Sequence, residues 1–326
     1  MIIYSKCSDY ATDICPCILA ENGHCIECSQ CRGENFCDCS DTASFCVMQE
    51  LRNNGGKAKE PRRAHLCEVS YVKDYEDMFR LIRLRVPRDQ VRDYSAIGSY
   101  VLVRMRDDPY FDVPVSVLHQ AYDSDTIGLL IQYRGIKTND FRTLRRGDMV
   151  HVRGPFFNGV QGRKAVASLR NSRALILCRG IGFLPSLSVM DSLRANGNSL
   201  DVYLDRGQFS GHVLDLYSGL FEIGIRETRI SDETGALTEE TRRIIEDSMQ
   251  NGTALIHLGL SDYLIGQLIR HLEEKQYAGA VSFINNARIC CGEGICGACT
   301  RDIRPGRMVH LCKEQLNRSE YHRIYG

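Results

Sequence analysis

The 16 cysteines of this 326-residue sequence are its main source of chemistry. Ten lie before residue 68, five lie after residue 289, and Cys178 lies alone between the two groups. The first ten residues, MIIYSKCSDY, contain no basic region followed by an apolar one, so we expect no secretory signal and a cytoplasmic protein. In such a compartment, clustered cysteines indicate metal or redox centres rather than disulfides.

The cysteines of residues 290–312, the C-terminal cysteine loop, have the spacing of an iron–sulfur site. They form a C-x4-C-x2-C run, and the last cysteine follows after twelve residues, as in plant-type 2Fe–2S proteins. Glycines between them permit tight turns that direct backbone N–H groups at the sulfurs. A structural zinc site is the alternative, but the glycine-rich gap favours a 2Fe–2S cluster, with Cys290 as a spare thiol. The expected ligands are Cys291, Cys296, Cys299 and Cys312.

A second cysteine run, at residues 15–39, predicts another metal centre. It contains C-x2-C-x2-C, the pattern of bacterial-type 4Fe–4S binding, and a Cys-Pro pair that supplies a candidate fourth ligand. Zinc is a stronger alternative here, because pairs spaced by two residues also form zinc knuckles. The expected ligands are Cys25, Cys28, Cys31 and Cys15. Four further cysteines compete for the fourth place: Cys17, Cys37, Cys39 and Cys46.

The remaining sequence predicts two kinds of folded element that would position these centres. Before residue 169, short runs alternate apolar and polar residues between Pro, Gly and Asp, which indicates an antiparallel barrel. After residue 174, buried strands alternate with helical patterns, which indicates a parallel α/β sheet. Residues 53–64 are polar and are expected to form a linker. We therefore expect an α/β plus β chain with four parts: a Cys-rich segment at 1–60, a barrel at 67–169, an α/β domain at 173–282, and a cluster loop at 283–326.

Composition excludes several classes of protein. Basic and acidic residues number 41 each, so the net charge is zero and we expect neither nucleic acid nor an anionic membrane as a partner. No apolar run approaches the roughly 18 residues of a membrane span.

CGEGICGAC near the end of a barrel-plus-α/β chain resembles the electron-transfer subunit of class B dihydroorotate dehydrogenase, a member of the ferredoxin–NADP reductase-like superfamily. GDMVHVRGPFFNG (147–159) and LCRGIGFLP (177–185) resemble, in the right order, the stretch that closes the flavin barrel and the turn into the nucleotide-binding domain. The resemblance covers about residues 68–326. It implies FAD in the barrel, an NAD(P)-binding-like domain, a 2Fe–2S cluster, and a hetero-oligomer with a catalytic subunit that is itself expected to be a flavoprotein.

The same resemblance assigns flavin-binding residues. The family's R-P-x-S motif holds the flavin, but Val113 replaces its arginine here, so the charge would come from Arg134 or Lys137. The resemblance also assigns residues that would flank the isoalloxazine ring or contact the pyrophosphate. It adds residues in the stretch that closes the barrel and in the glycine-rich turn into the nucleotide-binding domain. The expected cofactor-binding residues are Pro114, Val115, Ser116, Tyr133, Arg134, Lys137, Thr138, Gly154, Asn158, Gly180 and Gly182. A barrel that has lost flavin is the alternative.

The nicotinamide site departs further from the family. Its run of three glycines is replaced by Cys178-Arg179-Gly180, which puts a large side chain where backbone must approach a phosphate closely. The family's C-G-P turn is replaced by Leu258-Gly259-Leu260. We therefore expect weakened NAD(P)H use. Two interpretations stay open: Arg179 binds a phosphate itself, or the domain is retained as a scaffold.

The sequence thus predicts an electron-transfer subunit of an oxidoreductase complex, with FAD, a 2Fe–2S cluster and a second, 4Fe–4S, cluster as its cofactors. We expect no catalytic residues of its own, because no constellation suited to a substrate is found, so the partner subunit would hold the substrate. Two other hypotheses stay open: a self-sufficient NAD(P)H-dependent reductase, and a redox- or metal-sensing scaffold without flavin.

Overall fold

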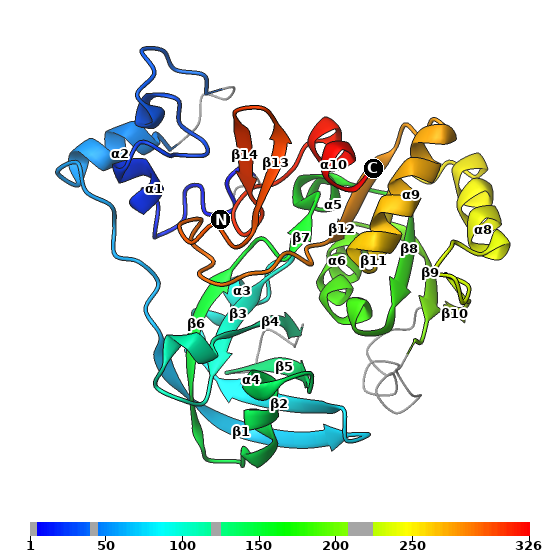
Figure 1. The fold of residues 1–326 in the computed structure, drawn as a ribbon, viewed down its shortest axis with the longest axis horizontal. Coiled ribbons are helices and arrows are strands. Elements are labelled where there is room, and N and C mark those ends of the chain that lie inside the picture. Colours follow the sequence, from blue (N-terminus) through cyan, green and yellow to red (C-terminus); the bar gives the residue numbers. More distant parts are fainter. Residues whose placement is uncertain (1–4, 40–44, 119–124, 208–223) are drawn as a thin grey trace.

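The computed structural model describes residues 5–39, 45–118, 125–207 and 224–326 (Figure 1). A barrel and a sheet with helices on both faces form the body of the molecule, and an N-terminal segment lies against the C-terminal cysteine loop. None of the helices in these four ranges is both long and apolar enough to cross a membrane.

Six antiparallel strands close the barrel in the order β1-β2-β5-β4-β3-β6. Their alternating apolar residues, such as Val69, Ile82 and Leu129, point inward and are fully buried. This architecture confirms the antiparallel barrel expected from the period-two pattern. The strands are β1 (His65–Tyr75), β2 (Phe79–Arg85), β3 (Tyr100–Arg104), β4 (Val113–Leu118), β5 (Thr126–Gln132) and β6 (Met149–Phe156). Two short helices flank them, α3 (Val91–Tyr94) and α4 (Ile136–Asn139).

The second sheet has the order β10-β9-β8-β11-β12-β7, and every pairing except β12 with β7 is parallel. The parallel α/β sheet is therefore also confirmed. Its strands are β7 (Val160–Gln161), β8 (Arg173–Arg179), β9 (Ser199–Asp205), β10 (Ile225–Glu227), β11 (Leu255–Gly259) and β12 (Ala280–Ile284). Its helices are α5 (Arg163–Ser168), α6 (Phe183–Ala195), α8 (Glu239–Gln250) and α9 (Asp262–Glu274).

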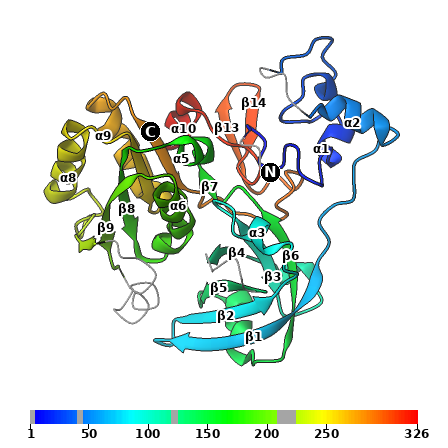
Figure 2. The same ribbon diagram turned by 180° about the vertical axis from the view of Figure 1, so that it is seen from behind.

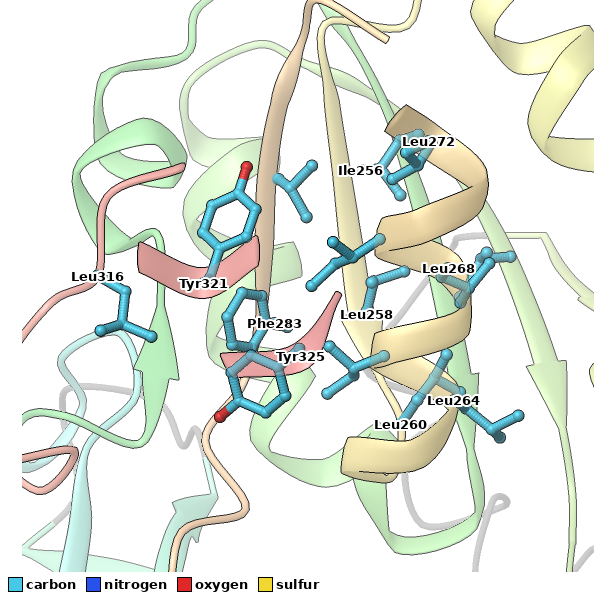
Figure 3. Close-up of a cluster of buried hydrophobic side chains, with 14 of the residues drawn as sticks. Ile256, Leu258, Leu260, Leu264, Leu268, Leu272, Phe283, Leu316, Tyr321 and Tyr325 are labelled. Carbon is cyan, nitrogen blue, oxygen red and sulfur yellow. The ribbon is translucent and has the colours of Figure 1, made fainter. Parts of the chain in front are cut away.

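The chain after Cys299 returns to this sheet. It forms a hairpin of β13 (Thr300–Arg304) and β14 (Arg307–His310) and ends in α10 (Arg318–Tyr325). Two tyrosines of α10 pack edge-on against Phe283 of β12, with ring centroids 5.7 Å (Tyr321) and 5.2 Å (Tyr325) away (Figure 3). Leucines of α9 cover the next strand, β11, so one apolar core anchors both helices.

The N-terminal segment lies beside the β13–β14 hairpin in both ribbon views (Figure 2). It contains α1 (Ile18–Glu21), a 3-10 turn η1 (Gln30–Arg32) and α2 (Val47–Asn53). Backbone hydrogen bonds join it to the chain after the hairpin: Ser8 N–H donates to the Lys313 carbonyl at 2.8 Å, and Gln315 N–H donates to the Lys6 carbonyl at 2.7 Å. An extended stretch then connects α2 to β1, where a linker was expected, but its Arg62 side chain is only 7 % exposed.

Candidate functional site

A cavity of about 350 Å³ separates the barrel from the second sheet and is called here the interdomain cavity. Its walls are β4, the end of β5, the turn from β8 into α6, and the chain after β12. Most of its lining is apolar, and its volume lies within the range of roughly 300–1,000 Å³ typical of small-molecule sites. Six of the residues expected to bind cofactor line it: Pro114, Val115, Ser116, Arg134, Thr138 and Gly182.

The other five expected residues do not line this cavity. The Tyr133 ring lies under the Arg142 guanidinium, 3.8 Å away, and its hydroxyl donates to Asp74 at 3.0 Å. Lys137 donates to the Asp112 carbonyl at 3.3 Å. Of the two cations considered as replacements for the missing arginine, Arg134 is therefore the one at the cavity. The other three expected residues that do not line the cavity are Gly154, Asn158 and Gly180.

Asn158 holds the C-terminal segment instead. Its Nδ2 donates to the carbonyls of Leu311 at 2.7 Å and Glu314 at 2.9 Å, and its Oδ1 accepts from Gln315 Nε2 at 2.7 Å. The side chain is completely buried, so these bonds satisfy groups that water does not reach. Asn158 thus positions the backbone on both sides of Cys312.

Several lining residues had not been expected. Asn285 and Asn286 follow β12 directly, at the carboxyl end of a parallel strand, which is where α/β sheets bind their ligands. Their place after a predicted strand could therefore have identified the two asparagines from the sequence. No sequence pattern could have identified Tyr100, because its position at the cavity depends on how the barrel packs on the sheet. The others are Leu118, Leu130, Ile131, Gln132, Gly159, Ile181, Leu184, Pro185, Ile284, Ala287, Ile289 and Val113.

Two glycines make the turn from β8 into α6 possible. A Cβ atom on Gly182 would lie 2.2 Å from the Gly259 carbonyl oxygen, and one on Gly259 would lie 2.5 Å from the Gly182 oxygen. Either side chain would push the turn away from the end of β11. Below the turn, Ser186 Oγ donates to the Gly182 carbonyl at 2.7 Å and lies 2.9 Å from His257 Nε2.

Arg179 turns toward the end of β9. Its Nε lies 3.4 Å from Asp205 Oδ2, and its guanidinium also donates to the Ser231 hydroxyl. Asp205 further accepts from the backbone N–H groups of Gly207 at 3.0 Å and Ile230 at 3.1 Å. An acidic residue in this region binds the ribose hydroxyls in dinucleotide folds. In this chain both carboxylate oxygens of Asp205 already have hydrogen-bond or ion-pair partners.

The C-terminal cysteine loop brings its four expected ligands together. Hydrogen bonding with the Cys312 thiol lowers the pKa of both Cys291 and Cys299. The Cys296 thiol interacts with the Cys291 thiol. Burial raises the pKa of Cys296. Backbone N–H groups point at the sulfurs, from Glu293 to Cys291 at 3.3 Å and from Cys312 to Cys299 at 3.4 Å.

Left-handed backbone at three glycines bends this loop, with φ of 73°, 76° and 73° at Gly292, Gly294 and Gly297. Converging thiols, N–H groups aimed at sulfur and these bends are what a 2Fe–2S cluster needs. In the described ranges, however, no three Cys, His, Asp or Glu side chains are arranged around the position of a single metal ion.

One pair of aromatic rings separates the loop from the interdomain cavity. Tyr100, in the cavity wall, stacks on Phe156 with ring centroids 5.1 Å apart and planes inclined by 14°. Phe156 in turn contacts the loop, since a Cβ on Gly292 would lie 2.4 Å from its ring. Arg153 adds a hydrogen bond to the Cys291 carbonyl at 3.0 Å.

The N-terminal cysteines expected to bind a cluster are buried in one group. Cys15, Cys25, Cys28 and Cys31 share a core with Val47 and Leu51. Burial, together with the Cys28 thiol, raises the pKa of Cys31. Cys28 N–H donates to Cys25 Sγ at 3.3 Å.

Comparison with known proteins agrees with this architecture. No protein-family model matches the chain. It is 24 % identical over 220 residues to the electron-transfer subunit of dihydroorotate dehydrogenase B (NAD(+)) of Clostridium acetobutylicum, covering 67 % of this chain and 81 % of that one. The subunit of the same name from Enterococcus faecalis is 23 % identical over 245 residues, covering 72 % and 89 %.

Solved structures show the same fold at low identity. The NADH-dependent reduced ferredoxin–NADP oxidoreductase superposes with a TM-score of 0.58 at 15 % identity, over 77 % of this chain and 87 % of that one. Ferredoxin–NADP+ reductase from Plasmodium falciparum gives 0.50 at 10 %, over 68 % and 96 %. The fold is therefore that of the ferredoxin–NADP reductase-like superfamily. In sequence, the chain is similar to electron-transfer subunits of dihydroorotate dehydrogenase B, as its cysteine loop suggested.

Proposed function

We propose that this chain is an electron-transfer subunit that holds FAD in the interdomain cavity and a 2Fe–2S cluster in the C-terminal cysteine loop. The stacked pair of Tyr100 and Phe156 is the observation that carries the proposal, because Tyr100 lines the cavity and Phe156 contacts the cysteine loop, so two stacked rings connect the two sites. The sequence relatives are themselves electron-transfer subunits, which supports a catalytic partner subunit that holds the substrate.

The cavity residues would orient the flavin and exclude water. Arg134 supplies the cation at the cavity, and Thr138 Oγ1 accepts from the N–H groups of Arg134 at 2.8 Å and Gly135 at 3.1 Å, which holds that turn in place. Ser116 and Asn286 add polar groups to walls that are mainly apolar. FAD, when bound, exchanges electron pairs with two-electron donors and single electrons with clusters.

Weak use of NAD(P)H forms part of the proposal. In dinucleotide-binding folds an acidic residue in this region holds the ribose of NADH, and bare backbone at the glycine turn lets the pyrophosphate approach. Asp205 is engaged by Arg179 and by two backbone N–H groups, and Arg179 carries its side chain across that region. Electrons would therefore reach the flavin mainly through a partner or the clusters.

Replacing one loop cysteine tests the cluster. In Cys296→Ser, the EPR signal of a reduced 2Fe–2S cluster should disappear while the FAD content stays unchanged, because the flavin lies beyond the aromatic pair. The matched control is Cys290→Ser, since both cysteines are exposed and lie in one loop, but Cys290 is the spare thiol. An unchanged signal in Cys296→Ser, or no flavin in wild-type protein, would contradict the proposal.

Stopped-flow mixing with NADH tests the nucleotide site. We expect the flavin of the isolated wild-type chain to be reduced over seconds or more slowly. Arg179→Ala should accelerate this reduction by roughly tenfold or more, because it removes the large side chain from the turn and one of the partners of Asp205. Arg173→Ala is the control, since Arg173 pairs with Asp201 at 3.3 Å at the other end of β8. Flavin reduction within milliseconds in the wild type would refute weak NADH use.

A further inference from the structure

A hollow outside the interdomain cavity lies where α10 crosses α9 beside β13, and it is called here the α9–α10 hollow. α9 contributes Asp262, Tyr263 and Arg270 to its lining, β13 contributes Arg301, and α10 contributes Tyr325. The hollow is open to solvent and has a volume of about 280 Å³, just below the range of roughly 300–1,000 Å³ in which drug-sized ligands bind. A smaller ligand therefore fits it.

The close crossing of the two helices fixes the position of this lining. A Cβ on Gly266 would lie 2.3 Å from the Tyr325 carbonyl oxygen, so α10 lies directly on the first turns of α9. The Tyr325 ring packs against Phe283, and its hydroxyl points away from the leucines of α9 (Figure 3). Burial raises the pKa of Tyr325, the charge of Asp262 raises it further, and the charge of Arg301 lowers it, so both charged groups lie near this ring.

Three charged side chains of the hollow have no ion-pair partner. Within the described ranges, Asp262, Arg270 and Arg301 form no salt bridge, and Asp262 accepts no hydrogen bond. The Asp262 Oδ1 atom is closed to solvent, which leaves Oδ2 as the oxygen open to the hollow. Arg301 is held in place by a hydrogen bond from its Nη1 to the Thr300 carbonyl at 3.0 Å, and Arg270 is exposed. The lining therefore lacks both an anion for the arginines and a donor for the carboxylate.

Two guanidinium groups and one carboxylate suit a particular ligand chemistry. Arginine binds phosphate through charge-assisted and often bidentate hydrogen bonds. A carboxylate in the same site repels a fully ionised oxyanion, but it accepts a hydrogen bond from an oxyanion that keeps a proton. Hydrogen phosphate offers negative oxygens to the arginines and a P–O–H group to the carboxylate. Sulfate carries the charge without the proton, so the same carboxylate selects against it.

We propose that the α9–α10 hollow binds a phosphate group, which Arg270 and Arg301 hold and Asp262 selects. The ligand is inorganic phosphate or a small phosphate monoester, since both keep the same group. The inference goes beyond the proposed electron-transfer function and does not rest on it. Arg301 stands two residues after Cys299, so a bound phosphate would join the C-terminal cysteine loop to α9 and stabilise their packing.

Calorimetric titration of the full chain with inorganic phosphate, methyl phosphate and sulfate tests the proposal at about pH 6, where a phosphate group still keeps part of its second proton. The ionic strength is the same in all titrations, because salt screens exposed charges. We expect phosphate to bind and sulfate to bind roughly tenfold or more weakly. Tighter binding of methyl phosphate than of inorganic phosphate would identify a monoester as the ligand, and the reverse would identify the free ion.

Variants of the lining assign the binding to this hollow. Arg301→Met should weaken phosphate binding by roughly tenfold or more, because a charge-assisted hydrogen bond is lost. Arg304→Met is the matched control, since Arg304 is an exposed arginine of the same strand outside the lining. Asp262→Asn should instead remove the discrimination, so that sulfate binds about as tightly as phosphate, because an amide donates to an oxyanion that has no proton.

Equal phosphate affinity in Arg301→Met and the wild type would place the bound phosphate elsewhere and overturn the proposal. So would wild-type protein that binds no phosphate, or that binds sulfate as tightly as phosphate. Arg270→Met, at an exposed position, should weaken binding in the same way, and it gives the answer if Arg301→Met does not fold.

Discussion

His257 illustrates how single residues are held near the interdomain cavity. It is completely buried, with Nδ1 2.7 Å from Ser282 Oγ and Nε2 2.9 Å from Ser186 Oγ. Burial lowers the pKa of His257 to about 3, so the ring is neutral at ordinary pH. Since Ser186 holds the Gly182 carbonyl, the ring supports the glycine turn from below.

The His257 pKa predicts an acid-dependent loss of stability. Below about pH 6.5 the unfolded state binds a proton that the folded state does not bind until about pH 3, so stability falls as the pH drops through this window. The limiting slope is about 1.4 kcal/mol per pH unit. In His257→Gln, the fall in denaturation midpoint between pH 7 and pH 5 should be smaller than in wild type. His24→Gln, at an exposed histidine, is the control, and equal slopes in all three proteins would disprove the assignment.

At the scale of elements, the C-terminal helix explains how the cysteine loop stays in place. α10 crosses α9 so closely that a Cβ on Gly266 would lie 2.3 Å from the Tyr325 carbonyl oxygen. A capping box begins α10, with Asn317 accepting from Glu320 N–H at 3.0 Å and Glu320 accepting from Asn317 N–H at 3.0 Å. The loop is therefore anchored at its far end by helix packing and beside Cys312 by Asn158.

At the scale of the whole molecule, Arg62 joins three parts of the chain. It pairs with Asp9 of the N-terminal segment at 2.6 Å and Glu293 of the cysteine loop at 3.4 Å, and its Nε donates to the Pro155 carbonyl of the barrel at 2.6 Å. Its guanidinium carbon also lies 4.6 Å from the centroid of the Phe156 ring. Although burial raises the pKa of Asp9, the charges of Arg62 and Lys313 hold it well below its ordinary value.

Arg62→Met should therefore release the N-terminal segment. Removing one member of a buried ion pair leaves its partner uncompensated and costs about 3–5 kcal/mol. We expect faster proteolysis and faster amide hydrogen exchange in residues 5–39, with little change in the barrel. The neighbouring Arg63→Met provides the control, because that side chain is 79 % exposed and its pair with Glu60 contributes little. Equal protection in the two variants would show that Arg62 does not carry the junction.

Local patterns in the sequence determined the barrel, the parallel sheet and the shape of the cysteine loop. Alternation along strands such as β2 and β3 decides which residues face a core, and spacing with glycines decides how a short loop bends. Such features depend on neighbours along the chain, so they were predictable. The family resemblance also predicted cofactor-binding roles, which stay predictions, for six residues that line the cavity: Pro114, Val115, Ser116, Arg134, Thr138 and Gly182.

Tertiary structure alone decided which distant residues meet. Tyr100 and Asn285 line one cavity because the barrel packs on the sheet, and Arg179 reaches Asp205 because β8 and β9 are adjacent. Cys7 lies beside Glu314, 307 residues further on, because their backbones form an antiparallel bridge. No local spacing encodes contacts of that range, since they follow from the packing of whole elements into one core.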